Sequence, residues 1–362
     1  MTHSRNRTAR GGSGFGRGVR RFFRFIVLLL VLVMVACIGL VIGTEPREEP
    51  TPTELALADS AGAARSLAST ARALAGEATA ADSPPYESMA TIFDLHAAAL
   101  QLPDDATEPP PSAFSDTGND ARESPSTSPS AAPAVQPRDL LIDLALSYTK
   151  AFNAAATAEP GPARVLASVA TAQWLQARSL AGSMGVSLPS IPVPDAQYDG
   201  APACPVDVPL QRDTGLEGAR LAVLAEHRAA YAYELAAARA PEPQEYLPRM
   251  AEHDDAASSG SAVLAQQCVA EPLPAVAYSL TGDFLADTGR SLQLLEGAMV
   301  ETYADLVGVS RTGIVRTWAI RRLADTAQHA IETGAGQSPA TGLPAFPGIA
   351  ADEYPRLEEP GR

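Results

Sequence analysis

Two stretches of the chain combine apolar helical spacing with a glutamate on the apolar side. In the first, one face of the expected helix is small or apolar except at Glu226 and at Tyr233, seven positions later. In the second, the same kind of face contains Glu296, again with a tyrosine, Tyr303, seven positions later. An inward carboxylate is costly unless it is paired, hydrogen-bonded or protonated. We therefore expect two helices of one bundle whose facing glutamates share a proton, accept from tyrosine hydroxyls or bind a metal.

A histidine joins these groups from the helix expected between them. His253 falls on the apolar side of residues 243–268, so the inward ionisable set becomes Glu226, His253 and Glu296. Carboxylates and imidazole are also ligands for iron and other divalent metals. We favour a structural polar core, with a mononuclear metal site or a small-molecule site as the alternatives. The predicted polar core consists of Glu226, Tyr233, His253, Glu296 and Tyr303.

The last helix of this bundle, expected over residues 311–333, adds no inward polar group in this interpretation. Its apolar side is formed by Ile320, Leu323, Ala327 and Ala330. The opposite side is mainly polar and is expected to face solvent. It carries Trp318, Arg322, Asp325, His329 and Glu332.

Four motifs in this half of the chain resemble an uncharacterised ferritin-like domain of exported proteins from high-GC Gram-positive bacteria. They are the stretch LAEHRAAYAYELAAAR, the helix around His253, the run LLEGAMVETYADLV and the FPG at residues 346–348. The resemblance covers about residues 209–348 and implies a four-helix bundle without a known activity. Metal-binding ferritin-like bundles use two single glutamates and two Glu-x-x-His pairs. Here Met250 stands three residues before His253, so the inward set is at best half of a di-iron site.

No catalytic residue can be proposed from the sequence. His227, Tyr231 and Glu234 lie on a neighbouring face of the first helix and are expected to make surface or interhelical contacts. The chain has no G-x-S-x-G elbow, no Gly-rich phosphate loop that opens a helix and no H-E-x-x-H. We therefore expect a protein that is not an enzyme and that has no resident cofactor, with iron or another divalent metal as the alternative.

An uncharged apolar run at residues 25–43 predicts a membrane anchor. Seven arginines precede it and acidic residues follow it, so the positive-inside rule places residues 1–24 in the cytoplasm and the rest outside. A lipobox-like sequence ends at Cys37 within the run, so a lipoprotein anchored there is one alternative and a cleaved signal peptide is another. Each of these possibilities exports the remainder of the chain.

Two cysteines lie in the exported part, Cys204 and Cys268. In an oxidising compartment two cysteines are most simply a disulfide. No CxxC spacing supports metal binding by these cysteines. The bond would stabilise the fold by about 4 kcal/mol in the chain-entropy model.

The order of helical patterns and breakers predicts an all-α protein with two bundles. A proline-rich stalk and a first bundle occupy residues 44–187, interrupted by a Pro/Ser-rich tract at 103–137 that is expected to be disordered. A linker at 188–208 leads to the second, ferritin-like bundle at 209–348, and a flexible tail follows at 349–362. The helices are expected at 54–81, 86–101, 139–158, 162–184, 213–239, 243–268, 274–307 and 311–333.

Charge separates the predicted cytoplasmic tail from the exported part. All 42 acidic side chains follow residue 43, whereas seven of the 27 basic ones precede it. An acidic exported region argues against nucleic acid as a partner, because phosphate binding needs clustered cations. We expect a non-enzymatic binding or scaffold protein of the cell envelope, whose partner is another envelope protein or a small ligand. The alternative is a metal-binding oxidoreductase or metal-storage protein.

Overall fold

The computed structural model describes residues 49–77, 86–101, 135–189, 191, 193, 204, 214–280, 282–335, 342–350, 352 and 353. These residues contain helices and no strand, which confirms the all-α prediction. None of the helices in this part of the chain is long and apolar enough to cross a membrane. The predicted tail at 1–24, the predicted anchor at 25–43 with Cys37, and residues 103–134 of the predicted disordered tract lie outside the described residues.

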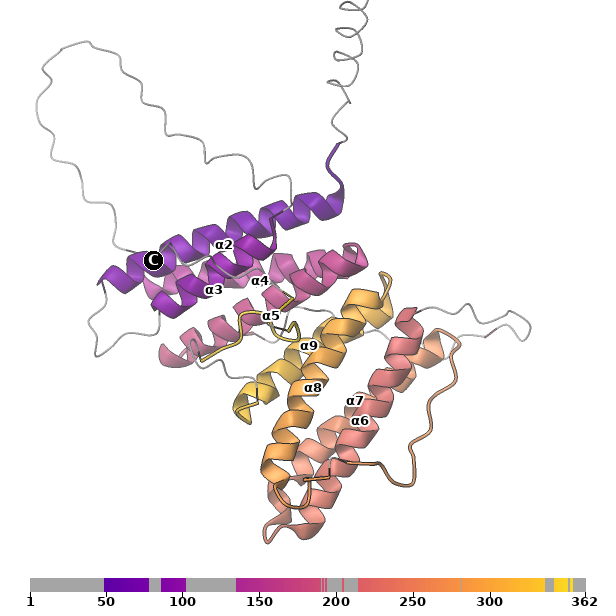
Figure 1. Cartoon of the computed structure of the whole chain (residues 1–362). Coiled ribbons are helices and arrows are strands. Elements are labelled where there is room, and N and C mark those ends of the chain that lie inside the picture. The colour runs from indigo at the N-terminus through magenta and orange to yellow at the C-terminus, as the bar shows by residue number, and fades with distance from the viewer. Residues whose placement is uncertain are drawn as a thin grey trace, which may run out of the picture. The chain divides into compact units, whose positions relative to one another are not determined.

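The helices pack chiefly as pairs of chain neighbours. The strongest contacts join α2 to α3, α4 to α5, α6 to α7 and α8 to α9 (Figure 1). The bounds are α2 (Pro52–Glu77), α3 (Tyr86–Ala99), α4 (Pro137–Thr157), α5 (Pro160–Ser183), α6 (Thr214–Arg239), α7 (Leu247–Gln266), α8 (Thr288–Val309) and α9 (Ile314–Glu332), with a 3₁₀ turn, η2 (Pro243–Glu245), before α7.

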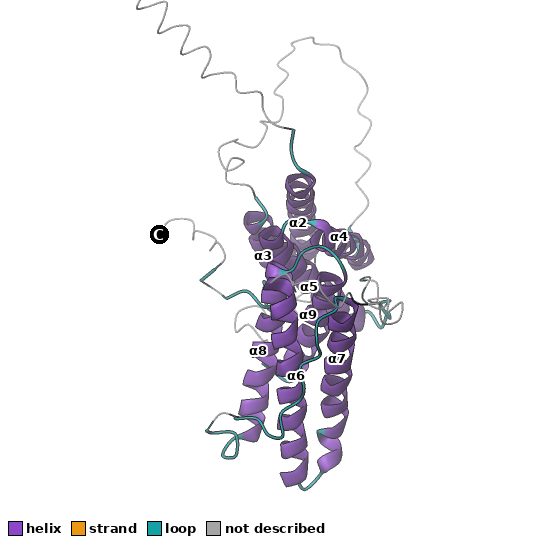
Figure 2. Ribbon diagram, turned by 90° about the vertical axis from the view of Figure 1, so that its right-hand side faces the viewer, coloured by secondary structure: helices purple, strands orange, loops and turns teal. Residues whose placement is uncertain are grey.

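Helix α5 connects the two sets of helices. Every residue from Leu166 to Ala177 is buried, and these residues are mostly small or apolar on all sides of the helix. The helix contacts α4 and α2, and it also contacts α8 and α9 (Figure 2). Residues 51–362 accordingly form one compact unit. The division into bundles at 44–187 and 209–348 stays a prediction, but helices from both proposed bundles share a core.

The helix predicted over residues 274–307 was placed too early. Residues 274–280 and 282–287 are not helical, and α8 begins at Thr288. The side chain of Asp287 accepts a hydrogen bond from the backbone N–H of Arg290, which caps the helix at that point. Leu285 precedes the helix and is exposed.

Side-chain contacts fix the directions of the last four helices. Glu226 of α6 meets Tyr303 of α8, and Tyr233 of α6 meets Glu296 of α8, so these two helices are antiparallel. Helix α7 turns back along α6 and therefore runs parallel to α8. The connection between α7 and α8, residues 267–287, is the one long crossover of the four helices, and its described residues are not helical.

A short segment after α9, residues 345–348, packs against three helices. His96 Nε2 of α3 lies 2.7 Å from the carbonyl oxygen of Ala345, and Ser168 of α5 donates to that of Pro347 at 2.9 Å. The ring of Phe346 is buried with its centroid 5.3 Å from that of His96. A Cβ added at Gly348 would lie 2.4 Å from Ala304 of α8. The segment therefore joins α3, α5 and α8.

The side chain of His96 is wholly buried at this junction. Its Nε2 is paired with the Ala345 carbonyl, while Nδ1 has no partner among the described residues. Burial lowers the pKa of His96 to about 4, against a smaller opposing effect of the backbone hydrogen bond. The imidazole is therefore neutral at physiological pH and donates its one N–H to the carbonyl.

Cys204 and Cys268 are joined in a disulfide, with their Cα atoms 5.5 Å apart. Cys268 follows the end of α7 with a φ of 57°, the left-handed conformation usually left to glycine. Its N–H donates to Ala265 and the N–H of Val269 donates to Leu264, which closes the helix in a Schellman motif. The pairing expected from the sequence is thus present, and it ties the end of α7 to the region before α6.

Replacing Gly348 with alanine is expected to destabilise the protein by about 2–5 kcal/mol. The residue has a φ of 76°, which costs a side-chain-bearing residue about 1–2 kcal/mol, and the added Cβ would also lie 2.7 Å from the Val300 carbonyl oxygen. The matched control is Gly342→Ala, since Gly342 has a φ of 72° and nothing within 4 Å of an added Cβ. Urea unfolding of both variants measures the difference, and equal losses would contradict the proposed packing of residue 348.

Candidate functional site

A cluster of charged and hydrogen-bonded side chains occupies the centre of α6–α9. The structure brings all five residues of the predicted polar core into this cluster and adds two arginines. Glu226, His253, Glu296 and Tyr303 are fully buried, and Tyr233 is nearly so. We call these seven residues the charge cluster: Glu226, Tyr233, Arg249, His253, Glu296, Tyr303 and Arg322.

Each tyrosine in the charge cluster donates a hydrogen bond to the glutamate of the other helix. Tyr233 of α6 donates to Glu296 Oε1 of α8 at 2.7 Å, and Tyr303 of α8 donates to Glu226 Oε1 of α6. Residues seven positions apart on one helix lie about 10 Å apart along its axis, so the two side chains of one Glu-x6-Tyr pair do not bond each other. The antiparallel arrangement of α6 and α8 brings each tyrosine opposite the partner helix's carboxylate.

The two arginines repeat this symmetry from the outer helices. Arg249 of α7 holds Glu296 with two hydrogen bonds, Nε to Oε1 at 2.7 Å and Nη2 to Oε2 at 2.5 Å. Arg322 of α9 donates from Nη2 to Glu226 Oε1 at 3.1 Å. Their side chains are only 11% and 14% exposed. Each buried glutamate therefore has a guanidinium partner, which compensates for the loss of water around the carboxylate.

His253 lies between the two glutamates. Its Nδ1 is 2.6 Å from Glu226 Oε2, and its Nε2 is 3.3 Å from Glu296 Oε1. A neutral imidazole has one donor and one acceptor nitrogen, so it cannot donate to both carboxylates, whereas the imidazolium can. Burial lowers the pKa of His253, but the hydrogen bonds to Glu226 and Glu296 raise it more, and the net shift is upward. The geometry and the pKa both favour a charged histidine.

The glutamates remain ionised despite their burial. Burial raises the pKa of Glu226, but His253 and Arg322 lower it more, and the net shift is downward. The pKa of Glu296 is likewise raised by burial and lowered further by Arg249 and His253, which leaves it well below its usual range. Burial and the neighbouring carboxylates raise the pKa of both tyrosines. The cluster thus contains fixed charges, and no member is prepared to act as a general base or nucleophile at neutral pH.

The residues of this site do not fit the metal that the ferritin-like resemblance suggests. All four carboxylate oxygens of Glu226 and Glu296 already accept hydrogen bonds or pair with His253. Two of the groups that bind them are guanidinium cations, which would repel a divalent ion. Among the described residues, no group of three or more His, Cys, Asp or Glu side chains is arranged to hold a metal ion. We therefore derive no chemistry through a metal here.

The expectation that the polar face of α9 is solvated was wrong for Trp318 and Arg322. Trp318 is buried, and its ring packs edge-on against Tyr303 with centroids 5.4 Å apart. Arg322 on the same face reaches Glu226. The apolar residues Ile320 and Leu323 are buried as well, because α9 contacts α5 and α4 as well as α6, α7 and α8. The helix is thus covered on two sides, which a single apolar stripe does not reveal.

Three other residues singled out in the sequence lie outside the charge cluster. Glu234 is exposed, and Tyr231 packs its ring against that of Tyr278, with centroids 5.8 Å apart. His227 is half-buried, and its Nε2 has no partner among the described residues. These residues therefore make surface or interhelical contacts and do not extend the cluster.

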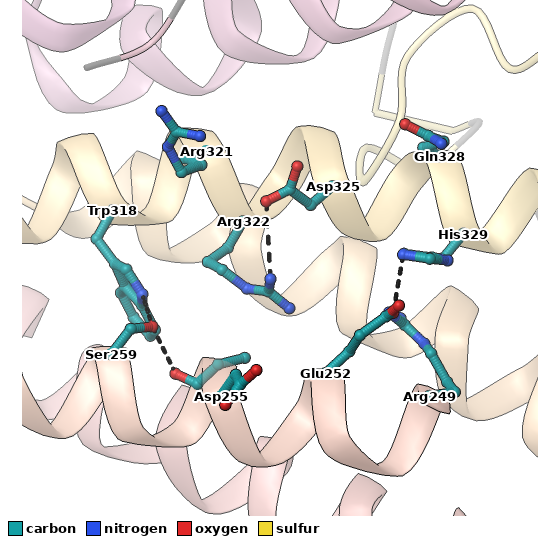
Figure 3. Close-up of a pocket in the computed structure, with 11 residues that line it drawn as sticks. Arg249, Glu252, Asp255, Ser259, Trp318, Arg321, Arg322, Asp325, Gln328 and His329 are labelled. Atoms are coloured by element: carbon teal, nitrogen blue, oxygen red, sulfur yellow. Dashed lines mark hydrogen bonds and ion pairs between the residues drawn. The ribbon is translucent and has the colours of Figure 1, made fainter. Parts of the chain in front are cut away.

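A cavity of about 560 Å³ lies between α7 and α9, beside the charge cluster (Figure 3). Both arginines of the cluster line it, so their guanidinium groups contact buried glutamates on one side and border the cavity on the other. Bridges cross from α7 to α9 at either end: Trp318 donates to Ser259 at 3.0 Å, and His329 Nε2 lies 3.0 Å from Glu252. The remaining lining residues are Asp255, Ala256, Arg321, Asp325 and Gln328.

Comparison with known families supports the predicted resemblance to an uncharacterised domain family. Residues 218–351 match the model of a family described as Domain of unknown function (DUF4439). This match begins at Gly218, within the first turns of α6, and covers the rest of α6, α7–α9 and the 345–348 segment. The searches of curated proteins and of solved structures found no match.

Replacing either cluster arginine with methionine is expected to destabilise the protein by about 3–5 kcal/mol, because each change leaves a buried glutamate without its cation. Arg290→Met is the matched control: Arg290 is exposed on α8, and only its backbone is used in capping. That change should stay within about 0.5 kcal/mol of the natural protein. Urea unfolding measures all three variants.

A double variant tests whether Glu226 and Arg322 stabilise the protein as a pair. Glu226→Gln combined with Arg322→Met should cost less than the sum of the two single changes by about 1 kcal/mol or more, because it removes both members of one ion pair. Additive losses, or an Arg322→Met variant as stable as the control, would show that the pair does not hold the bundle together.

Proposed function

We propose that this is a membrane-anchored extracytoplasmic protein that binds a small ligand without transforming it. In this proposal α6–α9 form a ferritin-like bundle in which the charge cluster occupies the centre, where related bundles hold metals. The ligand occupies the cavity between α7 and α9, and residues 25–43 anchor the chain. The disulfide between Cys204 and Cys268 agrees with an oxidising compartment outside the cytoplasm.

The connectivity of α6–α9 supports the ferritin-like assignment. Two antiparallel hairpins, α6 with α7 and α8 with α9, are joined by the long connection at residues 267–287. One long crossover is the feature that separates ferritin-like bundles from simple up-and-down ones. Two of the four helices, α6 and α8, each carry one inward glutamate, as two helices do in that architecture.

One observation carries the binding proposal: both cluster arginines line the cavity while buried glutamates hold them in place from the opposite side. A guanidinium fixed in this way loses little conformational entropy when a ligand binds to it. The cavity volume of about 560 Å³ also lies in the usual range for small-molecule sites.

The state of the ionisable groups supports binding over catalysis. A general base needs a pKa near the working pH and a free acceptor. Glu226 and Glu296 have lowered pKa values and occupied oxygens, and the tyrosine pKa values are raised. These groups therefore suit a role in positioning Arg249 and Arg322.

A ligand screen with a cavity-filling variant tests this proposal. The full-length protein in detergent is heated with a panel of small polar compounds, and binders raise the midpoint of unfolding. Gln328→Trp on the cavity wall should abolish the rise, whereas Gln293→Trp, on α8 outside the cavity, should keep it. A rise that survives Gln328→Trp would place the ligand elsewhere. If mass spectrometry showed that the protein converts a bound compound to a product, the non-enzymatic assignment would be contradicted.

A further inference from the structure

The cavity between α7 and α9 presents a positive group with unused donors. Arg322 donates from Nη2 to Glu226, and its Nη1 forms an ion pair with Asp325 at 3.7 Å, which is longer than a hydrogen bond. Its Nε is buried without a hydrogen-bond partner among the described residues, so an anion in the cavity would have to approach Nη1. A guanidinium has five N–H donors in a planar fork that matches a carboxylate. Arg322 is therefore held in place but still able to receive an anionic group from the cavity.

The same cavity presents a negative group opposite this cation. Asp255 lines the cavity from α7, is exposed, and has no ion pair or hydrogen bond in the described part of the chain. In Figure 3, Arg322 extends from α9 toward α7, and Asp255 lies on α7 below it without a contact between the two side chains. A space therefore separates a cation and an anion that would otherwise pair directly.

The composition of the wall disfavours ligands with charge of only one sign. The wall contains three acidic side chains, which oppose a purely anionic ligand, and three arginines, which oppose a purely cationic one. The acids are Glu252, Asp255 and Asp325, and the arginines are Arg249, Arg321 and Arg322. Like charges at close range in a partly dry site cost free energy, whereas a ligand with both signs can satisfy each wall. The charge pattern therefore selects for a molecule that carries a cation and an anion together.

The length of the cavity sets the size of that molecule. The lining residues of α7 extend from Arg249 to Ser259, a distance of about 15 Å along the helix axis. An extended chain of three amino acids spans about 10 Å. The cavity is therefore longer than a single amino acid, and a peptide of two or three residues would have to bend to bring both termini to Arg322 and Asp255, which face each other between the two bridges.

We propose that the cavity binds a zwitterionic short peptide, or a molecule of the same chemistry, with its carboxylate on Arg322 and its ammonium group on Asp255. This inference rests on the proposed binding function and specifies its ligand class. The bridges from Trp318 to Ser259 and from His329 to Glu252 bound the site along the groove. The buried Glu226 keeps the guanidinium of Arg322 in position before the ligand arrives.

Three matched peptides test the inference by calorimetric titration of the full-length protein in detergent. Trialanine carries both charges, N-acetyl-trialanine carries only the carboxylate, and trialanine amide carries only the ammonium group. Trialanine is expected to bind, and each blocked form should bind at least tenfold more weakly. Equal binding of a blocked form, or no binding of trialanine, would overturn the inference.

Single substitutions assign the two ends of the peptide. Asp255→Asn should weaken trialanine binding by about tenfold and leave N-acetyl-trialanine unchanged, since a tenfold change corresponds to one lost charged contact of about 1.4 kcal/mol. Asp254→Asn is the matched control, because Asp254 is exposed on the same helix but does not line the cavity. Arg322→Lys keeps the charge but loses the planar fork, so it should weaken trialanine and N-acetyl-trialanine alike.

The outcomes separate this inference from the proposed function. Other compounds could bind to the natural protein and lose their binding in Gln328→Trp, while none of the three peptides binds. In that case the ligand class is wrong and the binding function stands. If trialanine binds equally well to Asp255→Asn and to the natural protein, the assigned orientation is wrong. If trialanine binding survives Gln328→Trp, both the cavity and the ligand assignment fail.

Discussion

The last four helices depend on a charged histidine held between two buried glutamates. His253 has a carboxylate at hydrogen-bonding distance from each ring nitrogen, and each carboxylate is also bound by a tyrosine and an arginine. Removing any one partner would leave a charge in a dry site, which costs far more than the net contribution of the intact contact. The cluster therefore fixes the register of α6 against α8 and the positions of α7 and α9 around them.

This arrangement links the interior to the cavity. Because Arg249 and Arg322 are held by the buried glutamates, the charges that line the cavity are set by residues that never contact a ligand. A bundle with a metal at its centre would use the same glutamates as ligands. Here guanidinium groups from α7 and α9 occupy those carboxylates, and in the proposed function the polar centre holds the two arginines at the wall of the cavity.

The sequence predicted the inward residues well and their partners poorly. Helical spacing alone placed Glu226, His253 and Glu296 on inward faces, and the structure brings them together. Spacing could not show that each tyrosine donates to the glutamate of the other helix, since this pairing depends on the antiparallel direction of α6 and α8. Arg322 was expected in solvent because the sequence does not reveal that α5 covers the other side of α9. Arg249 lies four positions before His253, so helical spacing alone could have placed it on the same face of α7.

Nitrogen-15 NMR of the histidine side chains tests the central claim most directly. The pKa of His253 is raised by its two carboxylates, whereas burial lowers that of His96 to about 4. At a pH between about 4 and the ordinary histidine value of about 6.5, both rings would be mainly charged in an unfolded chain. In the folded protein, both nitrogens of His253 should carry protons and stay protonated above that ordinary value, while His96 should remain neutral. A neutral His253 in this range would contradict the account, because one of the two glutamates would then lack the proton that links it to the ring.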